Sequence, residues 1–381
     1  MIRKAKIFVI CAPEISNILH EEIKSLGFSK TKVHKLGVEL YGTLEDTMFL
    51  NLHLRTANKV LWQVGAFDAV TPDKMYKAAT KLSWEDEIDI NSYFNIDSYV
   101  SNDFIKDSRF ANLKLKDAIV DRFVRIKGKR PDSGPDKTMI RIYLHWRNEK
   151  CVLYYDTSGG VIAKHGYRKI PGKAPMLESL AAATILASKW DKKSPFVNPM
   201  CGSGTLAIEA ALLATNTAPG LFRKNFGFMH LKSFKAYQWE ELVEKAKEQI
   251  NPSNVKIMAS DISPEAIEVS QSNARTAGME KYIEFKISDF SKVEVPEEPG
   301  VVMLNPAYGE RLGEVEDLKT TYNEIGDFFK QQCKGYYGYI FTGNRELAKH
   351  VGLRTKRKIE FFNAQIDSRL LEYELYGGSR K

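Results

Sequence analysis

The chain has 381 residues, which corresponds to two or three domains of ordinary size. Hydrophobic residues make up 43% and charged residues 27%, so a disordered chain is excluded. The formal net charge of +8 is compatible with a nucleic-acid partner but does not establish one.

The apolar runs are all shorter than the ~20 residues of a membrane span, so we expect no membrane partner. The basic N-terminus leads into an apolar stretch that Pro13 and Glu14 interrupt, which predicts a first β-strand and not a signal peptide. The four cysteines are widely separated, and none belongs to a CxxC pair. We therefore expect no disulfide framework, no metal site and a cytoplasmic location.

The first 155 residues alternate short strands with amphipathic helices, which predicts one or two small α+β units. In chain order we expect a strand at 6–12, a helix at 14–26, a strand at 31–41, a helix at 44–60 and an extended segment at 61–69. A Thr-Pro cap at 71–72 begins a helix that reaches about residue 82. A strand at 92–100, a helix at 113–126 and a strand at 139–146 follow.

Residues 156–176 are rich in glycine and proline and are the best linker candidate. Beyond them we expect a helix at 177–190, a strand at 195–199, a helix at 205–214 and an insertion at 216–254. Next come a strand at 255–260, a helix at 264–277, strands at 283–287 and 300–304, a helix at 318–332 and a strand at 336–342. An extended pair at 358–366 and 370–376 completes the chain. This order predicts an α/β fold with a Rossmann-like sheet, mostly parallel with one antiparallel strand.

The strongest motif is the segment Phe-Val-Asn-Pro-Met-Cys-Gly-Ser-Gly-Thr at 196–205. A buried strand ends in a turn that contains Gly202 and Gly204, and the turn opens directly into a helix. Glycine permits close approach of a ligand, and the helix N-terminus offers free N–H groups to an anion. A plain tight turn between strand and helix is the alternative interpretation.

Three further strands end in polar motifs, which are Asp261, the pair Asp289-Phe290, and the segment Asn-Pro-Ala-Tyr at 305–308. Open α/β sheets bind ligands at the carboxyl ends of their strands, so we expect these motifs to share one edge with the glycine turn. Gly204 and Asp261 are much farther apart than the ~20 residues of a dinucleotide fingerprint, which disfavours NAD.

With these motifs the chain resembles the class I S-adenosylmethionine-dependent methyltransferases that carry an (Asn/Asp)-Pro-Pro-(Tyr/Phe) motif and methylate exocyclic amino groups of bases. The resemblance implies that Gly202 and Gly204 line the methionine end of the cofactor, that Asp261 binds the ribose, and that Asp289 and Phe290 flank the adenine. The full set of implied cofactor-binding residues is Asn198, Pro199, Cys201, Gly202, Gly204, Thr205, Asp261, Ile262, Asp289, Phe290 and Glu178.

A finer resemblance extends over nearly the whole chain. Residues 98–130, the segments Asp-Thr-Ser-Gly-Gly at 156–160 and Gly-Tyr-Arg at 166–168, and residues 174–182 are similar to the THUMP-containing RNA guanine-N2 methyltransferases, which include an enzyme of 23S rRNA. This implies a ferredoxin-like domain at 1–65, a THUMP RNA-binding domain at 66–160 and a methyltransferase domain at 161–381. Some members carry a second methyltransferase downstream; because the sequence ends at Lys381, we do not expect that activity.

The resemblance places the chemistry at Asn305, Pro306 and Tyr308. The Asn305 side-chain oxygen and the Pro306 carbonyl would accept the hydrogens of a guanine N2 amine, while Tyr308 stacks on the flipped base. Two departures are Asn198, where many relatives carry Asp, and Ala307, which replaces the second proline. We expect these departures to affect cofactor affinity and rate more than reaction type.

A covalent mechanism through Cys201 is a possible alternative, since base C5 methylation needs a thiolate nucleophile. However, Cys201 lies in the cofactor loop, and the segment 303–309 contains no cysteine. We therefore interpret Cys201 as a small packing residue.

Two basic segments are candidates for RNA binding. Residues 122–130 hold five basic and no acidic side chains, although a solvated helix end would look the same. In the insertion, the basic residues Arg223 and Lys224 lie close to Phe226 and Phe228, a mixture of charge and aromatic rings as in single-strand platforms; a flap that covers the core is the alternative. The candidate RNA contacts are Arg122, Arg125, Lys127, Lys129, Arg130, Arg223 and Lys224.

The prediction is thus a methyltransferase that acts on the N2 amine of a guanine in 23S rRNA. Three alternatives stay open, namely a tRNA guanine-N2 enzyme, an N6-adenine DNA methyltransferase and a non-catalytic RNA-binding assembly factor. The same tetrapeptide serves both amines, but we find no base-reading domain of the kind that a DNA enzyme needs.

Overall fold

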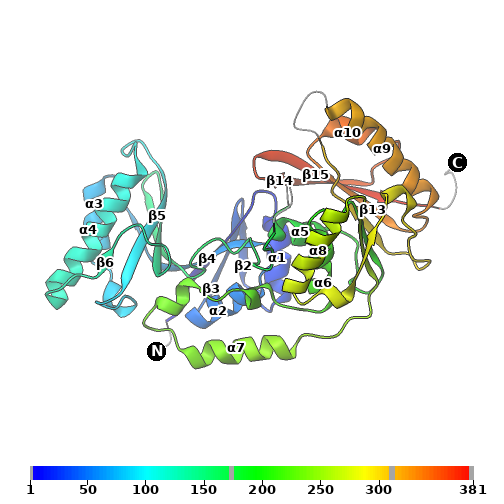
Figure 1. Ribbon diagram of the computed structural model, residues 1–381. Coiled ribbons are helices and arrows are strands. Elements are labelled where there is room, and N and C mark those ends of the chain that lie inside the picture. Colours follow the sequence, from blue (N-terminus) through cyan, green and yellow to red (C-terminus); the bar gives the residue numbers. More distant parts are fainter. Residues whose placement is uncertain (1–2, 171–175, 309–313, 377–381) are drawn as a thin grey trace. The chain divides into compact units, whose positions relative to one another are not determined.

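The computed structural model describes residues 3–170, 176–308 and 314–376 (Figure 1). Contacts divide the chain into two compact units, each built around one β-sheet. The N-terminal unit comprises Met1–Cys11, Leu19–Ile162 and Arg223–Lys245. The C-terminal unit comprises Ala12–Ile18, Ala163–Phe222 and Ala246–Lys381.

The N-terminal unit holds a single sheet of eight strands in the order β2-β3-β1-β4-β8-β7-β5-β6. The strands are β1 (Ala5–Cys11), β2 (Thr31–His34), β3 (Gly37–Gly42), β4 (Ala57–Asp68), β5 (Tyr93–Ser101), β6 (Asp132–Ser133), β7 (Ile140–Arg147) and β8 (Lys150–Asp156). The long strand β4 joins the two halves, because it pairs with β1 near its start and with β8 over its later residues. The one or two α+β units expected from the sequence are therefore one continuous sheet.

One face of this sheet is covered by helices, and the other face is more open. In β7, the side chains of Ile142, Leu144 and Trp146 are fully buried, whereas Tyr143 and His145 on the opposite face are only half-buried. Helices α3 (Pro72–Ala79) and α4 (Ser108–Lys127) pack together and contact β4 and β5 respectively. Helix α2 (Leu44–His53) packs on β3 and β4.

The C-terminal unit holds a seven-stranded sheet in the order β11-β10-β9-β12-β13-β15-β14. The strands are β9 (Phe196–Pro199), β10 (Ile257–Asp261), β11 (Ile283–Ile287), β12 (Val301–Leu304), β13 (Tyr337–Thr342), β14 (Arg357–Asn363) and β15 (Ile366–Glu374). The first five strands of that order are parallel, and β15 runs antiparallel to both β13 and β14. The predicted mostly parallel sheet with one antiparallel strand is thus confirmed.

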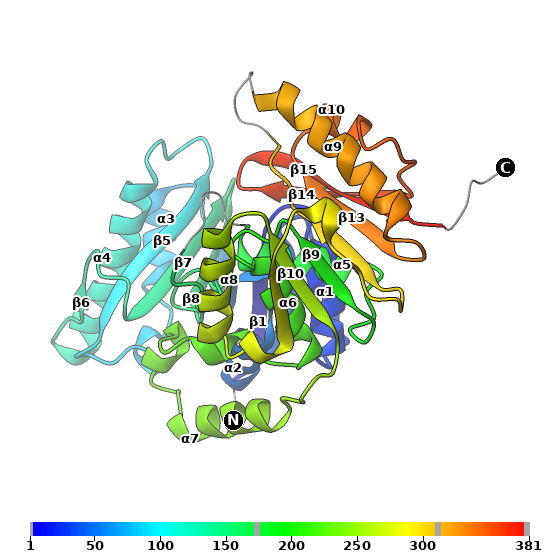
Figure 2. The ribbon, with the colours of Figure 1, turned by 45° about the vertical axis from the view of Figure 1, so that its right-hand side comes forward.

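The helices of this unit are α5 (Glu178–Ala187), α6 (Thr205–Ala214), α8 (Pro264–Thr276), α9 (Glu314–Gln331) and α10 (Arg345–Lys349). Helix α6 contacts β9 and β10, and α8, which Figure 2 shows beside β10, contacts β10 and β11. Strands β9 and β12 are buried along their whole length, as expected where helices cover a parallel sheet. The buried strands fix the positions of the loops that follow them.

Two expected elements are wrong in the N-terminal unit. The helix expected at 44–60 ends at His53, because the Glu22 carboxylate accepts hydrogen bonds from the backbone N–H groups of Arg55 and Thr56 at 2.7 and 3.1 Å and holds them outside the helix. The single strand expected at 31–41 is a hairpin, β2 and β3, which turns between His34 and Gly37.

The expected linker at 156–176 is well packed over its first residues. Thr157 and Ser158 are fully buried, and both form hydrogen bonds with the Asn51 side chain, at 3.0 and 2.6 Å. The boundary between the two units does fall in this segment, after Ile162. Residues 171–175 lie outside the described residues.

Candidate active site

The loops after β9, β10 and β12 meet at one edge of the C-terminal sheet. Strand β9 pairs in parallel with β10 on one side and with β12 on the other, so the three strand ends are neighbours. The backbone N–H of Gly202 donates to Asp261 Oδ2 at 3.0 Å, which joins the glycine turn to the acidic residue that ends β10. The predicted common edge is therefore present.

The glycine turn has left-handed backbone conformations, with φ of 58° at Met200, 55° at Gly202 and 80° at Gly204. A Cβ atom at Gly204 would lie 2.7 Å from Ser270 Cβ on α8, so this position requires glycine. At Gly202 nothing lies within 4 Å of such an atom, which leaves its backbone open to a ligand. Helix α6 begins directly after Gly204 without a side-chain cap, so its first N–H groups are available to an anion.

A cavity of about 120 Å³ lies beside this turn. It is lined by Met176, Asn198, Met200, Cys201, Gly202, Ser203, Thr205, Leu206 and Asn305. Asn198 Oδ1 and Asn305 Oδ1 are both buried and have no hydrogen-bond partner among the described residues. Both oxygens can therefore accept hydrogen bonds from a molecule bound in the cavity.

The loop of Asn305 to Tyr308 is held by its neighbours although Ala307 replaces the second proline. Pro306 is buried, and Tyr308 is half-buried. Asn363 Nδ2 donates to the Tyr308 hydroxyl at 2.8 Å, and Asn344 Nδ2 donates to the Tyr308 carbonyl at 3.3 Å. These contacts supply part of the restraint that a proline ring would give.

Asp261 accepts a second hydrogen bond, from the Ser263 N–H to Oδ1 at 3.0 Å. The next side chain, Ile262, is 69% exposed, which leaves an apolar surface beside the carboxylate. Asp289 Oδ1 accepts hydrogen bonds from the hydroxyl and N–H of Ser291, which lower the pKa of Asp289. Both carboxylates are therefore fixed in orientation at adjacent strand ends.

Phe290, which was predicted to flank the adenine, has its ring in the core. Its ring is buried and packs edge-to-face against Phe328, in a core cluster under β12 and α9. A ring held in the core does not offer its face to a ligand, so a contact of Phe290 with the cofactor stays a prediction.

Glu178, which was predicted to bind the cofactor, is not among the residues that line the cavity. It is buried and pairs with Arg168 at 3.2 Å, and burial raises the pKa of Glu178. Arg168 also donates to the carbonyl of Met176, a cavity residue, at 2.5 Å. Glu178 therefore supports the cavity wall through Arg168.

Cys201 lines the cavity, but its chemistry does not suit a nucleophile. Burial raises the pKa of the Cys201 thiol to about 12, so the thiol stays protonated near neutral pH. Because the thiolate is the reactive form, this favours the packing interpretation.

The basic stretch at the end of α4 is only partly available to a ligand. Arg122 is mostly buried, pairs with Glu85 at 2.5 Å and donates to the carbonyls of Thr80 and Lys81. Arg122 is therefore a structural residue, contrary to the prediction. The remaining four basic side chains are exposed; they are Arg125, Lys127, Lys129 and Arg130.

The aromatic residues of the insertion do not form the predicted single-strand platform. Phe226 and Phe228 are fully buried, stack on each other at 5.1 Å and pack against Trp239. Arg223 lies over the Phe226 ring and donates to the carbonyls of Ser158 and Val161. That prediction was wrong, because Arg223, Phe226 and Phe228 form a local core, and of the four predicted residues only Lys224 is exposed.

Four cavity residues were missed as site residues, namely Met176, Met200, Ser203 and Leu206. Met200 and Ser203 lie inside the glycine motif, so their position in the turn was an available signal. Met176 lies in the expected linker, where no periodicity marks it.

A parallel sheet with a glycine turn and carboxylates at neighbouring strand ends defines an α/β protein that binds a nucleotide-like ligand at this edge. Comparison with known protein families supports this description of the fold and the site. Residues 165–372 match the RMKL-like methyltransferase domain, residues 6–61 the RlmL ferredoxin-like domain and residues 69–156 the THUMP domain. The chain belongs to the RMKL-like methyltransferase family.

A curated relative, ribosomal RNA large subunit methyltransferase K/L of Psychromonas ingrahamii, is 36% identical over 97% of this chain and 50% of its own length. The chain spans about half the length of the curated relatives it matches.

Two solved structures are similar over nearly their whole length. SMU.472, described as a methyltransferase and crystallised with S-adenosylhomocysteine, has a TM-score of 0.89 and 27% identity, with 100% of both chains covered. A predicted N6-adenine-specific DNA methylase from Listeria monocytogenes has a TM-score of 0.88 and 29% identity, with 97% of this chain and 96% of that chain covered. Among the described residues, no helix is both long and apolar enough to cross a membrane.

Proposed function

We propose that this chain transfers a methyl group from S-adenosylmethionine to the N2 amine of a guanine in 23S rRNA, in the cytoplasm. The main structural support is that two buried oxygens without a hydrogen-bond partner among the described residues, Asn198 Oδ1 and Asn305 Oδ1, line one cavity beside the glycine turn. The names of the curated relatives and the S-adenosylhomocysteine complex of SMU.472 support the choice of substrate and cofactor.

The residues present fit this cofactor. The free N–H groups at the start of α6 suit its carboxylate, and Asn198 Oδ1 suits its ammonium group. Asp261 can accept hydrogen bonds from ribose hydroxyls, and the exposed Ile262 side chain can cover one face of the adenine. When bound, the cofactor supplies an electrophilic methyl group on a sulfonium.

The chain's own contribution is to position the amine and stabilise the charge that develops on it. A guanine N2 amine is a poor nucleophile, because its lone pair is delocalised into the ring. Asn305 Oδ1 and the Pro306 carbonyl accept its two N–H groups, which turns the lone pair toward the methyl carbon and stabilises the positive charge on nitrogen. Methyl transfer would leave a positive charge on this nitrogen, which the two acceptors stabilise until one amine proton is lost to solvent.

The target base must leave its stack to reach this cavity, and flipping costs least for an unpaired base. Tyr308 follows the acceptor pair in the loop and is available to stack on the base. Structured RNA offers unpaired bases in loops and bulges, and the match to a THUMP domain favours RNA over DNA. The rival function is N6-adenine methylation of DNA, since the Listeria relative is named for it.

The test is transfer of labelled methyl by the purified full chain to 23S rRNA, tRNA and DNA from cells that lack this activity, followed by mass spectrometry of nucleosides. We expect N2-methylguanosine in 23S rRNA alone. Methyladenine in DNA would show that the chain is a DNA methyltransferase, and methylguanosine in tRNA would show that it is a tRNA methyltransferase. No transfer to any of the three, with cofactor bound, would favour a non-catalytic role.

In the same assay, Asn305→Ala is expected to lower single-turnover methyl transfer by roughly 10²–10³-fold, because it removes an acceptor that stabilises developing charge. Cofactor affinity, measured by calorimetry, should change little. Equal losses of affinity and rate would contradict the role assigned to Asn305.

A further inference from the structure

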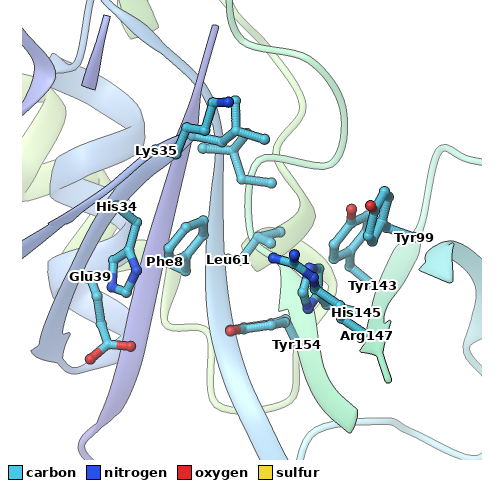
Figure 3. A pocket seen from close by; sticks show the side chains of 12 residues that line it. Phe8, His34, Lys35, Glu39, Leu61, Tyr99, Tyr143, His145, Arg147 and Tyr154 are labelled. Atoms are coloured by element: carbon cyan, nitrogen blue, oxygen red, sulfur yellow. The ribbon is translucent and has the colours of Figure 1, made fainter. Parts of the chain in front are cut away.

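The open face of the N-terminal sheet holds a second cavity, of about 540 Å³ (Figure 3). This volume lies within the range of about 300–1,000 Å³ that is typical of ligand pockets. Six rings line it, contributed by five strands of the sheet; they are Phe8, His34, Tyr99, Tyr143, His145 and Tyr154. We call this site the sheet pocket.

Strand register explains why the rings gather there. Tyr99 of β5 lies opposite His145 of β7, and Tyr143 of β7 lies opposite Tyr154 of β8. Because side chains alternate between the faces of a strand, Tyr143 and His145 share the open face of β7. The opposite face carries the buried core, so packing of the fold does not require rings on the open face.

One pair of rings is arranged as a platform. Tyr99 and His145 stack with centroids 5.3 Å apart and an interplanar angle of 13°. Tyr99 is 48% exposed, so an aromatic surface remains in contact with water. Burial, and secondly the charge of Arg147, lowers the pKa of His145, which keeps the imidazole neutral at physiological pH. A neutral ring beside a tyrosine suits stacking with a planar base.

The acidic groups near the sheet pocket are neutralised within the sheet. Glu39 pairs with Lys6 at 3.1 Å, and Asp97 pairs with Lys137 at 3.2 Å and with Arg141.

Unpaired charge at the pocket is positive. Lys35 and Arg147 line the pocket, are exposed and have no ion-pair partner among the described residues. His34 Nε2 is buried without a hydrogen-bond partner in the same part of the chain. Stacked rings with flanking cations are the chemistry that binds single-stranded nucleic acid.

We propose that the sheet pocket binds an unpaired stretch of the RNA substrate, with one base stacked on the Tyr99–His145 platform and the neighbouring phosphates on Lys35 and Arg147. The proposal rests on the proposed function for the identity of the RNA. It adds a second, base-stacking contact site in a unit that holds none of the candidate catalytic residues. The alternative is that the sheet pocket binds a protein, and the tests below distinguish the two kinds of partner.

The first test measures binding of a fluorescent 12-nucleotide oligouridine RNA to the full chain by anisotropy at low salt. Loss of one stacked base predicts that Tyr99→Ala weakens binding roughly tenfold, whereas Tyr99→Phe, which keeps the ring, stays within about twofold. Tyr237→Ala is the matched control, since Tyr237 is 65% exposed on α7 (Ala236–Glu248) and does not line the pocket. It should bind like the wild type.

The second test separates base stacking from charge. An abasic oligonucleotide of the same length and a blunt RNA duplex should both bind more weakly than the oligouridine. Charge reversal at Lys35 and Arg147 should weaken binding and reduce its salt dependence. Tyr99 is half-exposed, so the alanine variant should keep the thermal unfolding midpoint of the wild type, which excludes misfolding as the cause.

The result that overturns the proposal is equal binding of the wild type and Tyr99→Ala, or equal binding of the abasic and normal strands. Absence of oligouridine binding in a protein that still methylates 23S rRNA overturns it too, and would point to a protein on this face. RNA binding that depends on Tyr99, without methyl transfer to any substrate, would contradict the proposed function but would still support RNA binding by the sheet pocket.

Discussion

Asn198 Nδ2 donates a hydrogen bond of 2.9 Å to the carbonyl of Met303, and this bond joins the end of β9 to the end of β12. Its partner atom Oδ1 faces the cavity without a hydrogen-bond partner among the described residues. The Asn198 amide therefore donates a hydrogen bond to β12 through its nitrogen and offers an acceptor to the cavity through its oxygen. A carboxylate could perform only the acceptor task, because it has no N–H to give to Met303.

Asn198→Asp is accordingly expected to lower the free energy of unfolding by about 1–3 kcal/mol, since it leaves the buried Met303 carbonyl facing a negative charge. Chemical denaturation measures this value. Asn216→Asp serves as a control, because Asn216 is exposed and its left-handed backbone suits aspartate. Unchanged stability of Asn198→Asp would show that the bond to Met303 is dispensable.

Gly204→Ala is expected to destabilise the C-terminal unit for two reasons, the φ of 80° and the 2.7 Å approach to Ser270 Cβ. Gly278→Ala isolates the first reason, because its φ is 67° but nothing lies within 4 Å of a Cβ atom there. Overpacking predicts that Gly204→Ala costs about 1–3 kcal/mol more than Gly278→Ala. Adding Ser270→Gly should restore part of that difference, and a double variant with no recovery would contradict this explanation.

The edge of the C-terminal sheet was predictable from the sequence for a physical reason. Strands β9, β10 and β12 are short and largely buried runs, so the polar motifs that follow them had to lie at strand ends. Gly204, Asp261 and Asn305 were placed correctly on this basis. Helix α10 was missed, because five residues after the Asn344 cap are too few to show a helical period.

Two further failures of prediction share one cause, which is contact with residues elsewhere in the sequence. The helix expected through residue 60 ends early because Glu22, 33 residues before Arg55, binds the backbone there. The rings at 226 and 228 are buried because Trp239, on a separate helix, packs against them. Composition alone does not distinguish a buried aromatic cluster from an exposed platform.

Cys201→Ser is expected to keep methyl transfer within a few-fold of the wild type, because we interpret Cys201 as a packing residue. Burial raises the pKa of the Cys201 thiol to about 12, so the reactive thiolate appears only as the pH approaches that value. Iodoacetamide should therefore label Cys201 very slowly in the native protein between pH 7 and 9. Rapid labelling that abolishes methyl transfer, together with an inactive serine variant, would support covalent catalysis by Cys201.

We expect the buried aromatic residues of the insertion to stabilise the fold and not to bind RNA. Phe228 is fully buried between Phe226 and Trp239, so Phe228→Ala should cost about 3–5 kcal/mol of stability through the cavity it creates. Lys224→Ala, at an exposed position four residues earlier, should change stability by no more than about 0.5 kcal/mol. Thermal and chemical unfolding of the two variants measure the difference. A stable Phe228→Ala protein with weakened RNA binding would reverse the assignment, because only an exposed ring that stacks on a base gives that combination.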